Sequence, residues 1–226
     1  MKFKHLLAGL TALSLVASAQ ATNILTENFD SFTAMTGSGW VVKNNSANPN
    51  SNPDSTWSQG SPGSAFDAQA GASDSYAGVG FASSNFGNVL DNWLFTPSFA
   101  LAAGEVVTFY TRSNGDLPDH LEVRMSGNGT STNISDFTSL LFDLNPALDA
   151  DGYPTGWTQY QFTIPAFSGG DTGRLAFRYF VTDAQNNGDY IGIDTLSVVP
   201  EPATVMSLGI GMLALLAMRR RRNDSI

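Results

Sequence analysis

The sequence has no cysteine and only 2 histidines among its 226 residues. Without cysteine, disulfide bonds, zinc–thiolate sites and thiol nucleophiles are excluded. His5 lies in the apolar N-terminal segment, so a Ser-His-Asp arrangement would have to use His120, and no Gly-x-Ser-x-Gly motif accompanies it. These absences argue against nucleophilic hydrolysis. His120, beside Asp119 at the start of an alternating strand, is interpreted as a solvent-edge or turn residue.

Positive charge is also scarce. Residues 22–200 carry 18 Asp and Glu against 5 Lys and Arg, an excess of 13 negative charges. Such a chain repels phosphate backbones and anionic lipid head groups, so we expect no nucleic-acid partner. Divalent cations and neutral glycans suit this charge better.

The N-terminus has the layout of a secretory signal. Lys2 and Lys4 precede an apolar run from Leu6 to Val16, which is too short for an ordinary membrane span. Ala19 and Ala21 supply the small residues of a cleavage site. The sequence therefore predicts a signal peptide over residues 1–21, removed by signal peptidase after Ala21, and export of the chain from Thr22 onward.

The C-terminus combines a proline-rich step, an apolar run and a basic cluster. The step is Val199-Pro200-Glu201-Pro202, the uncharged run covers residues 203–218, and the cluster is Arg219, Arg220, Arg221 and Arg222. As a helix the run would reach roughly 24 Å, just enough for a bilayer core of about 30 Å. Arginines mark the cytoplasmic side. We expect a single C-terminal transmembrane helix, with one domain over residues 22–199 facing away from the cytoplasm.

The order of these three parts in residues 200–226 resembles the PEP-CTERM sorting signal. The resemblance implies processing by an exosortase in a Gram-negative bacterium. It also implies a periplasm-facing membrane intermediate that passes to the cell surface or extracellular matrix. An ordinary C-terminal membrane anchor is the alternative.

Between the two ends, the pattern is that of strands. Apolar residues alternate with polar ones, as in Leu121, Val123 and Met125, and turn-forming Gly, Asn, Ser and Asp separate the runs. The sequence predicts an all-β fold, a two-sheet antiparallel β-sandwich of jelly-roll type. The predicted strands cover residues 24–29, 40–43, 76–82, 92–96, 106–112, 121–125, 139–144, 159–164, 174–181 and 190–198. Residues 44–75 are predicted as a long surface excursion anchored by Trp57 and Phe66.

An ordered set of short motifs resembles the choice-of-anchor J domain, a relative of cleaved-adhesin and MAM-type jelly rolls. His120 stands where an arginine is expected in that pattern. The resemblance implies a jelly roll attached to the surface by one of several alternative tails. The motifs include Glu27-Asn28-Phe29-Asp30, Asp91-Asn92-Trp93-Leu94-Phe95-Thr96-Pro97, Asp119-His120-Leu121-Glu122-Val123-Arg124 and Ile191-Gly192-Ile193-Asp194.

Carboxylates near the first and last strands are candidate calcium ligands. In jelly rolls these strands run close together, and calcium takes 6–8 oxygen ligands. We therefore expect Glu27, Asp30 and Asp194, with Asp91 as a further candidate, to bind a structural calcium ion. The alternative is that these acids cap turns. Asp149-Ala150-Asp151-Gly152 imitates a calcium loop, but Tyr153 occupies the third oxygen position, which favours a plain turn.

Aromatic and basic residues complete the candidates. Trp57, on the long polar segment, is the candidate sugar-stacking platform, whereas Trp93 and Trp157 are expected in the core. Each strand arginine is expected to pair with an acid such as Glu122, Asp119 or Asp183. These arginines are Arg112, Arg124, Arg174 and Arg178.

Two functions fit these features. The first is an exosortase-sorted, non-catalytic surface or matrix protein that adheres to polysaccharide, because PEP-CTERM proteins tend to occur with exopolysaccharide systems. The alternative is a glycan-active enzyme, a glycoside hydrolase or lyase, that uses a pair of carboxylates on the same fold.

Overall fold

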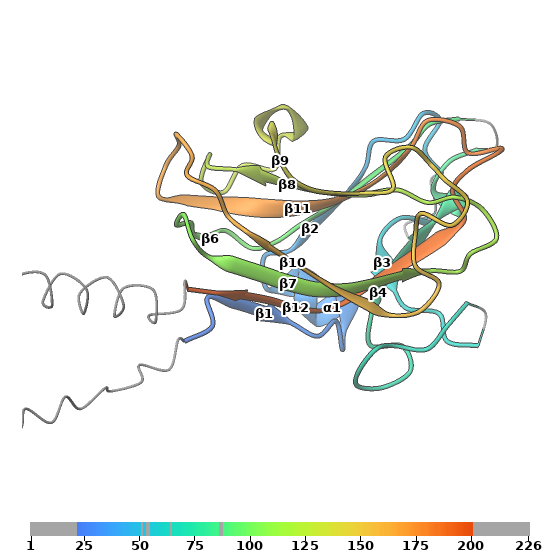
Figure 1. Ribbon diagram of the computed structural model, residues 1–226, viewed down its shortest axis with the longest axis horizontal. Coiled ribbons are helices and arrows are strands. Elements are labelled where there is room, and N and C mark those ends of the chain that lie inside the picture. Colours follow the sequence, from blue (N-terminus) through green and yellow to red (C-terminus); the bar gives the residue numbers. More distant parts are fainter. Residues whose placement is uncertain (1–21, 51, 53–54, 64, 86–87, 201–226) are drawn as a thin grey trace, which may run out of the picture. The chain divides into compact units, whose positions relative to one another are not determined.

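The computed structural model describes residues 22–200, except for 51, 53–54, 64 and 86–87 (Figure 1). The predicted signal peptide, the transmembrane run at 203–218 and Arg219 to Arg222 lie outside the described residues. Among the described residues, no helix has the length and apolar character needed to cross a membrane.

Two antiparallel sheets of six strands each form the domain, and Figure 1 shows them as two layers. In the first sheet the order is β10-β7-β12-β4-β3, with β1 also pairing with β12. Its strands are β1 (Leu25–Glu27), β3 (Ser58–Gln59), β4 (Ala77–Gly80), β7 (Val106–Ser113), β10 (Thr158–Thr163) and β12 (Tyr190–Val199).

The second sheet has the order β2-β5-β11-β8-β9, with β6 pairing with β11. Its strands are β2 (Val41–Asn44), β5 (Leu90–Phe95), β6 (Phe99–Ala100), β8 (Leu121–Ser126), β9 (Ser139–Leu144) and β11 (Thr172–Val181). The helical elements are α1 (Phe32–Gly37), η2 (Phe81–Ser83) and η3 (Ile134–Asp136). The predicted two-sheet sandwich is therefore confirmed, and each predicted strand is present with its ends within two residues.

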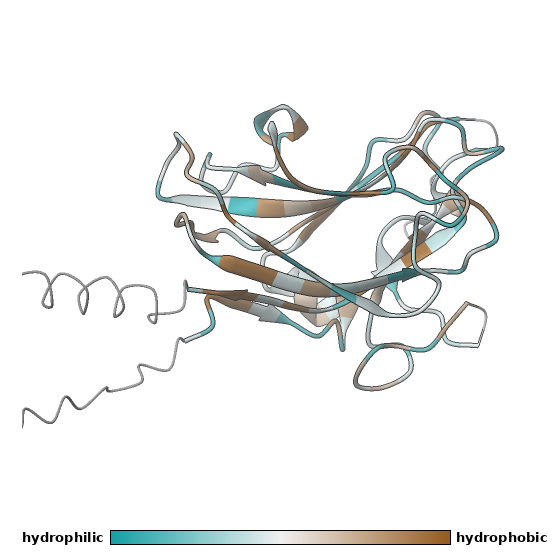
Figure 2. Cartoon of the chain, viewed as in Figure 1, coloured by the Kyte–Doolittle hydropathy of each residue, from teal (hydrophilic) through white to brown (hydrophobic). Residues whose placement is uncertain are grey.

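Side-chain alternation builds the core between the layers. Every second residue of β7 is buried, because alternate side chains of a strand point to opposite faces. The ring of Phe109 lies 5.2 Å from that of Phe177 in the opposite sheet and 5.5 Å from that of Phe142. Figure 2 shows the hydrophobic residues following the strands while the hydrophilic ones gather in the turns.

A second apolar cluster lies on the outer face of the β2-β5-β11-β8-β9 sheet. Trp93 stacks on Phe95 at 5.7 Å, and Phe137, from the segment after η3, packs edge-on against Phe95 at 4.9 Å. All six residues of β5 are buried as a result. Trp93 is thus a core residue, as predicted.

Trp57 and Phe66 anchor residues 44–75, as predicted, but the segment is not a surface excursion alone, because it also forms the short strand β3. Trp57 is 1% exposed, and its indole N–H donates to the carbonyl oxygen of Asn92 at 3.2 Å. Phe66 is 6% exposed. The segment contributes β3 and buries its two large rings, since an indole left in water would forgo a large apolar contribution to folding.

Candidate functional site

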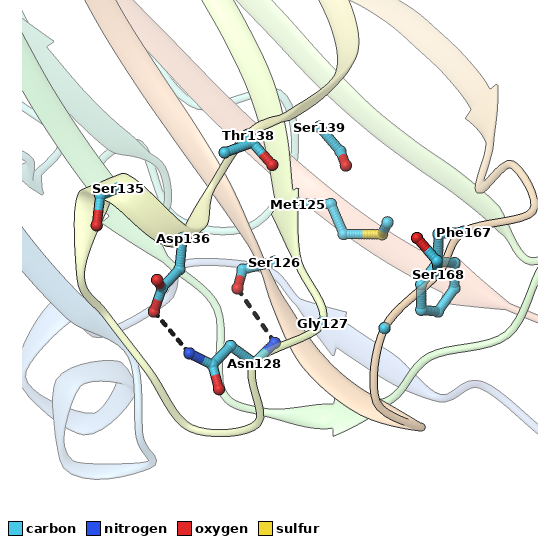
Figure 3. A pocket seen from close by; sticks show the side chains of 11 residues that line it. Met125, Ser126, Gly127, Asn128, Ser135, Asp136, Thr138, Ser139, Phe167 and Ser168 are labelled. Carbon is cyan, nitrogen blue, oxygen red and sulfur yellow. Dashed lines mark hydrogen bonds between the residues drawn. The ribbon is translucent and has the colours of Figure 1, made fainter.

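A polar cavity of about 390 Å³ opens at the end of the β2-β5-β11-β8-β9 sheet. Three segments line it, namely residues 125–128 at the end of β8, residues 135–139 leading into β9, and residues 167–169 before β11 (Figure 3). The volume lies in the range of small-ligand sites. The cavity is therefore a candidate binding site.

Hydrogen bonds hold the polar side of this cavity in place. Asp136 Oδ2 accepts from Ser131 Oγ at 2.6 Å and from Asn128 Nδ2 at 2.8 Å. These two bonds hold the pKa of Asp136 below its usual range, because they stabilise the ionised form. The backbone N–H of Asn128 in turn donates to Ser126 Oγ at 3.2 Å. The carboxylate is therefore charged and pre-positioned without any cation beside it in the cavity lining.

The opposite side of the cavity is mixed, because the ring of Phe167 stands beside the hydroxyl group of Ser168 (Figure 3). Met125 also lines the cavity, and residues 138–139 add hydroxyl groups. Hydroxyl, amide and carboxylate groups beside an aromatic ring suit a neutral polyol such as a sugar. Asp136 is the one carboxylate among the lining residues, whereas glycoside hydrolysis by the common mechanisms needs two.

Three of the predicted calcium ligands lie at one corner of the other sheet. Glu27 on β1 faces Leu196 of β12 in the pairing register. Asp194, on β12, accepts the backbone N–H groups of Gln69 and Ala70 through Oδ2 at 2.9 and 3.1 Å. Asp30 Oδ1 lies close to the next residue, Gly71. The oxygen is 3.0 Å from the position that a Cβ atom would occupy on this glycine.

The corner is partly satisfied internally. Glu27 accepts the backbone N–H of Phe29, and Asp194 Oδ1 accepts that of Thr195 at 2.6 Å. Burial raises the pKa of Asp194, and the backbone hydrogen bonds oppose this rise. Both the turn-capping interpretation and the calcium interpretation use these same oxygens.

Asp91 does not belong with that group, so its inclusion is wrong. It lies on β5 in the other sheet and is 5% exposed. Arg178 Nε contacts its Oδ1 at 2.6 Å, and the indole N–H of Trp93 donates to the same oxygen at 2.8 Å. A guanidinium already neutralises this carboxylate.

Trp57 cannot serve as a sugar platform, because a ring that is 1% exposed offers no face to a ligand. Trp157 also differs from its prediction. It is half-buried rather than in the core, and its ring packs edge-on against Phe66 at 5.5 Å and Tyr76 at 5.8 Å. Its indole N–H donates to the carbonyl oxygen of Asp67 at 2.8 Å.

His120 is buried rather than at a solvent edge. Its Nε2 lies 2.7 Å from Asp143 Oδ1 and its Nδ1 lies 2.9 Å from the carbonyl oxygen of Phe180. Both ring nitrogens therefore lie within hydrogen-bond distance of oxygen atoms of the protein. His120 has no nitrogen available as a general base toward a substrate.

The side chains of His120, Glu122 and Asp143 come close enough to share a metal ion, with ligand atoms within 4.8 Å of one another. Glu122, however, is already paired with Arg124 at 2.5 Å and Arg178 at 3.1 Å. The hydrogen bond from Arg124 and the charge of Arg178 hold the pKa of Glu122 low against the effect of burial. Two guanidinium groups therefore already occupy the Glu122 carboxylate, which makes it a poor ligand for an external cation.

The arginine predictions are confirmed in part. Arg178 faces Glu122 across the β11–β8 pair, and Arg124 also reaches that carboxylate. Arg174 instead donates to carbonyl oxygens of Gly39, Thr96 and Thr130. Arg112 stacks over the ring of Phe66 at 4.3 Å. Among the described residues, neither of these two forms an ion pair.

Comparison with known proteins gives two matches along the chain. A family model for the Cleaved Adhesin Domain matches residues 23–198, and one for the PEP-CTERM protein-sorting motif matches residues 198–222. No curated protein matches the chain.

Two similar solved structures are domains of Lys-gingipain from Porphyromonas gingivalis. The K3 cleaved adhesin domain is 22% identical, with a TM-score of 0.55, and the match covers 80% of this chain and 99% of that one. The K1 domain is also 22% identical, with a TM-score of 0.54 and coverage of 78% and 97%. At this identity the likeness concerns the fold alone.

Proposed function

This chain belongs to the Cleaved Adhesin Domain family, and from that membership we propose that it is an exported, non-catalytic adhesive protein of the cell surface or extracellular matrix. The observation that carries the proposal is the arrangement of the two matches. The sorting motif at residues 198–222 follows directly on the adhesin domain at residues 23–198. An adhesin domain with a sorting tail is suited to display outside the cell.

The route is inferred from the two ends. Signal peptidase removes residues 1–21, the C-terminal helix holds a periplasm-facing intermediate in the inner membrane of a Gram-negative cell, and an exosortase-type enzyme processes the tail. The choice-of-anchor J pattern is the narrower family description consistent with such a tail.

Sorting is tested by changing the basic cluster. With Arg219 to Arg222 all replaced by serine, the protein is expected to be misplaced or released early, because the cytoplasmic end of the helix is no longer fixed. Cell fractionation and the mass of the processed protein provide the readout, with Glu201→Ala as a second variant that blocks processing but not export. Identical localisation and mass in all forms would contradict sorting by this tail.

The ligand is proposed to be a neutral polysaccharide, bound at the cavity beside Asp136. Support comes from its polar groups, the ring of Phe167 and the absence of a cation in its lining. A screen of the exported protein against immobilised glycans would identify the sugar. Turnover of a bound glycan would instead favour the alternative of a glycan-active enzyme.

A structural calcium ion at Glu27, Asp30 and Asp194 is the second part of the proposal. Asp194 accepts backbone N–H groups of the turn at residues 69–71, and Asp30 lies beside Gly71 of the same turn. Glu27 lies on β1, which pairs with the strand that carries Asp194. Such an ion would stabilise the junction of the first and last strands rather than take part in binding.

A further inference from the structure

A different group of acids lies where three turns meet, at the other end of β12 from Val199. The Oδ1 atom of Asp119 accepts the backbone N–H of Asp189 at 2.9 Å, and the N–H of Gly188 donates to the carbonyl oxygen of Pro118 at 2.7 Å. The side-chain amide of Asn145 donates to the carbonyl oxygen of Asp119 at 2.9 Å. These bonds tie together the turns that precede β8, follow β9 and precede β12.

Two carboxylate oxygens in this junction are buried without a partner. Asp119 is 0% exposed, and its Oδ1 also accepts the hydroxyl of Tyr179 at 2.7 Å. Its Oδ2 is buried with no hydrogen-bond partner among the described residues, and Asp189 Oδ2 is in the same condition. Buried polar atoms almost always have partners, so each such oxygen requires an explanation.

No side-chain cation compensates these charges. In the part of the chain that the structure describes, neither Asp119 nor Asp189 forms an ion pair. The neighbouring His120 turns its ring nitrogens to Asp143 and to a backbone carbonyl instead. A buried charge is stable only when it is paired, hydrogen-bonded or bound to a metal.

Burial and neighbouring negative charge raise the pKa values of both acids in the junction. Burial raises the pKa of Asp119 to about 7, and the negative charge of Asp189 contributes to the rise. Burial likewise raises the pKa of Asp189, and the charge of Asp116 adds to the rise, while hydrogen bonds from the Asn114 side chain and from the backbone of Asp116 oppose it. Each acid therefore makes ionisation of its neighbour less favourable, which is the situation that a bound cation reverses.

We propose that Asp119 Oδ2 and Asp189 Oδ2 bind one hard divalent cation of the calcium class at this junction. Both atoms are carboxylate oxygens, and the turns that meet here are rich in Asp and Asn and offer further carbonyl and side-chain oxygens. Nitrogen and sulfur ligands, which zinc would favour, are not directed at the site. The ion would bridge the turns that enter β8 and β12.

This site is separate from the corner of Glu27, Asp30 and Asp194. Asp189 directly precedes β12, and Asp194 lies within that strand. The five-residue separation corresponds to roughly 16 Å of extended chain. The two sites can therefore be emptied one at a time by substitution.

Terbium luminescence tests the proposal, because Tb³⁺ replaces calcium at oxygen sites and is sensitised by a nearby tyrosine, here Tyr179. The full-length chain in detergent is titrated with Tb³⁺ under tyrosine excitation and then with competing Ca²⁺. Asp119→Asn and Asp189→Asn should each lower the Tb³⁺ affinity, measured from the sensitised emission, by at least about tenfold. The control Asp194→Asn should keep the emission that Ca²⁺ displaces from this site.

Three results would overturn the inference. They are no sensitised emission in the wild type, unchanged emission in folded Asp119→Asn and Asp189→Asn, and loss of emission in Asp194→Asn alone. The last result would mean that the emission comes from an ion at the corner of Glu27, Asp30 and Asp194. It would support that calcium site and contradict the junction site. Circular dichroism establishes folding, and Asp189→Asn, at the less buried position, carries the test if Asp119→Asn does not fold.

Discussion

Two regions near the start of β8 bury carboxylates, and their charges are compensated in different ways. On the outer face of the sheet, Glu122 and Asp91 are almost fully buried, and Arg178 contacts both. Three residues before Glu122, Asp119 is equally buried but contacts no cation among the described residues. The pKa of Glu122 is lowered and that of Asp119 is raised. A chain with few cations neutralises one region itself and leaves the other to a proton or an external ion.

The largest effect should come from removing the internal cation. Arg178→Met keeps apolar contact with Trp93 but leaves Asp91 without its ion pair and Glu122 with Arg124 alone. Breaking a buried ion pair from one side costs about 3–5 kcal/mol. The free energy of unfolding in urea is the measurement, with Arg112→Met as the matched control, since Arg112 stacks on Phe66 without an ion pair. Equal losses in both variants would contradict the importance of the Arg178 ion pairs.

The second effect concerns pH and Asp119. In chelator, native Asp119 keeps its proton up to about pH 7, whereas the unfolded form loses it near pH 3.8. Between these values the native state binds more protons, so this group makes stability fall as pH rises and then level off. About three pKa units correspond to at most about 4 kcal/mol.

Asp119→Asn lacks this titration. The free energy of unfolding is measured for the variant and the wild type at pH 4.5 and at pH 7.5. The variant should be more stable relative to the wild type at pH 7.5 than at pH 4.5. A difference between the two proteins that does not change with pH would show that Asp119 titrates normally.

A smaller effect is expected from the ion itself. Calcium at about a hundredfold above its dissociation constant stabilises the native state by about 2.7 kcal/mol for each site. For a domain of this size, that is a rise of several degrees in melting temperature. The Asp119→Asn and Asp194→Asn variants should each lose part of the rise, and a melting curve that chelator leaves unchanged would contradict both ion sites.

Asp136 is the intermediate case, because neutral donors rather than a cation lower its pKa. Asp136→Asn removes the charge but keeps a polar group of the same shape, and it should weaken glycan binding, because hydrogen bonds to a charged group are stronger than those to a neutral one. Isothermal titration measures the change. Asp151→Asn, on an exposed turn outside the cavity, is the control and should bind like the wild type.

The fold could be predicted because the two-residue period of strands such as β7 and β8 is a local signal. The pairings between residues on neighbouring strands could not be predicted from such a local signal. Arg178 faces Glu122 only through the β11–β8 register, and the cavity brings together three segments that are distant in sequence. Its residues Ser126 and Asn128 belong to a Ser-Gly-Asn-Gly run, a pattern that indicates only a turn.

Trp57 shows why a polar segment can mislead. Its neighbours in sequence are Ser, Thr and Gln, but the ring reaches Asn92 of the other sheet, a contact that no local pattern reveals. Asp119 was considered only as a partner for an arginine, since sequence gives no sign that the nearby cations point elsewhere.

Adhesion is the central claim, and retention of the protein in the producing cell's own matrix tests it most directly. Cells expressing the wild type or Asp136→Asn are separated into cells, matrix and medium, and the protein in each fraction is quantified. We predict that the wild type stays in the matrix and is displaced by soluble matrix polysaccharide, whereas the variant shifts to the medium. Equal distribution of the two proteins would contradict binding through the cavity, and a wild type found wholly in the medium would contradict adhesion itself.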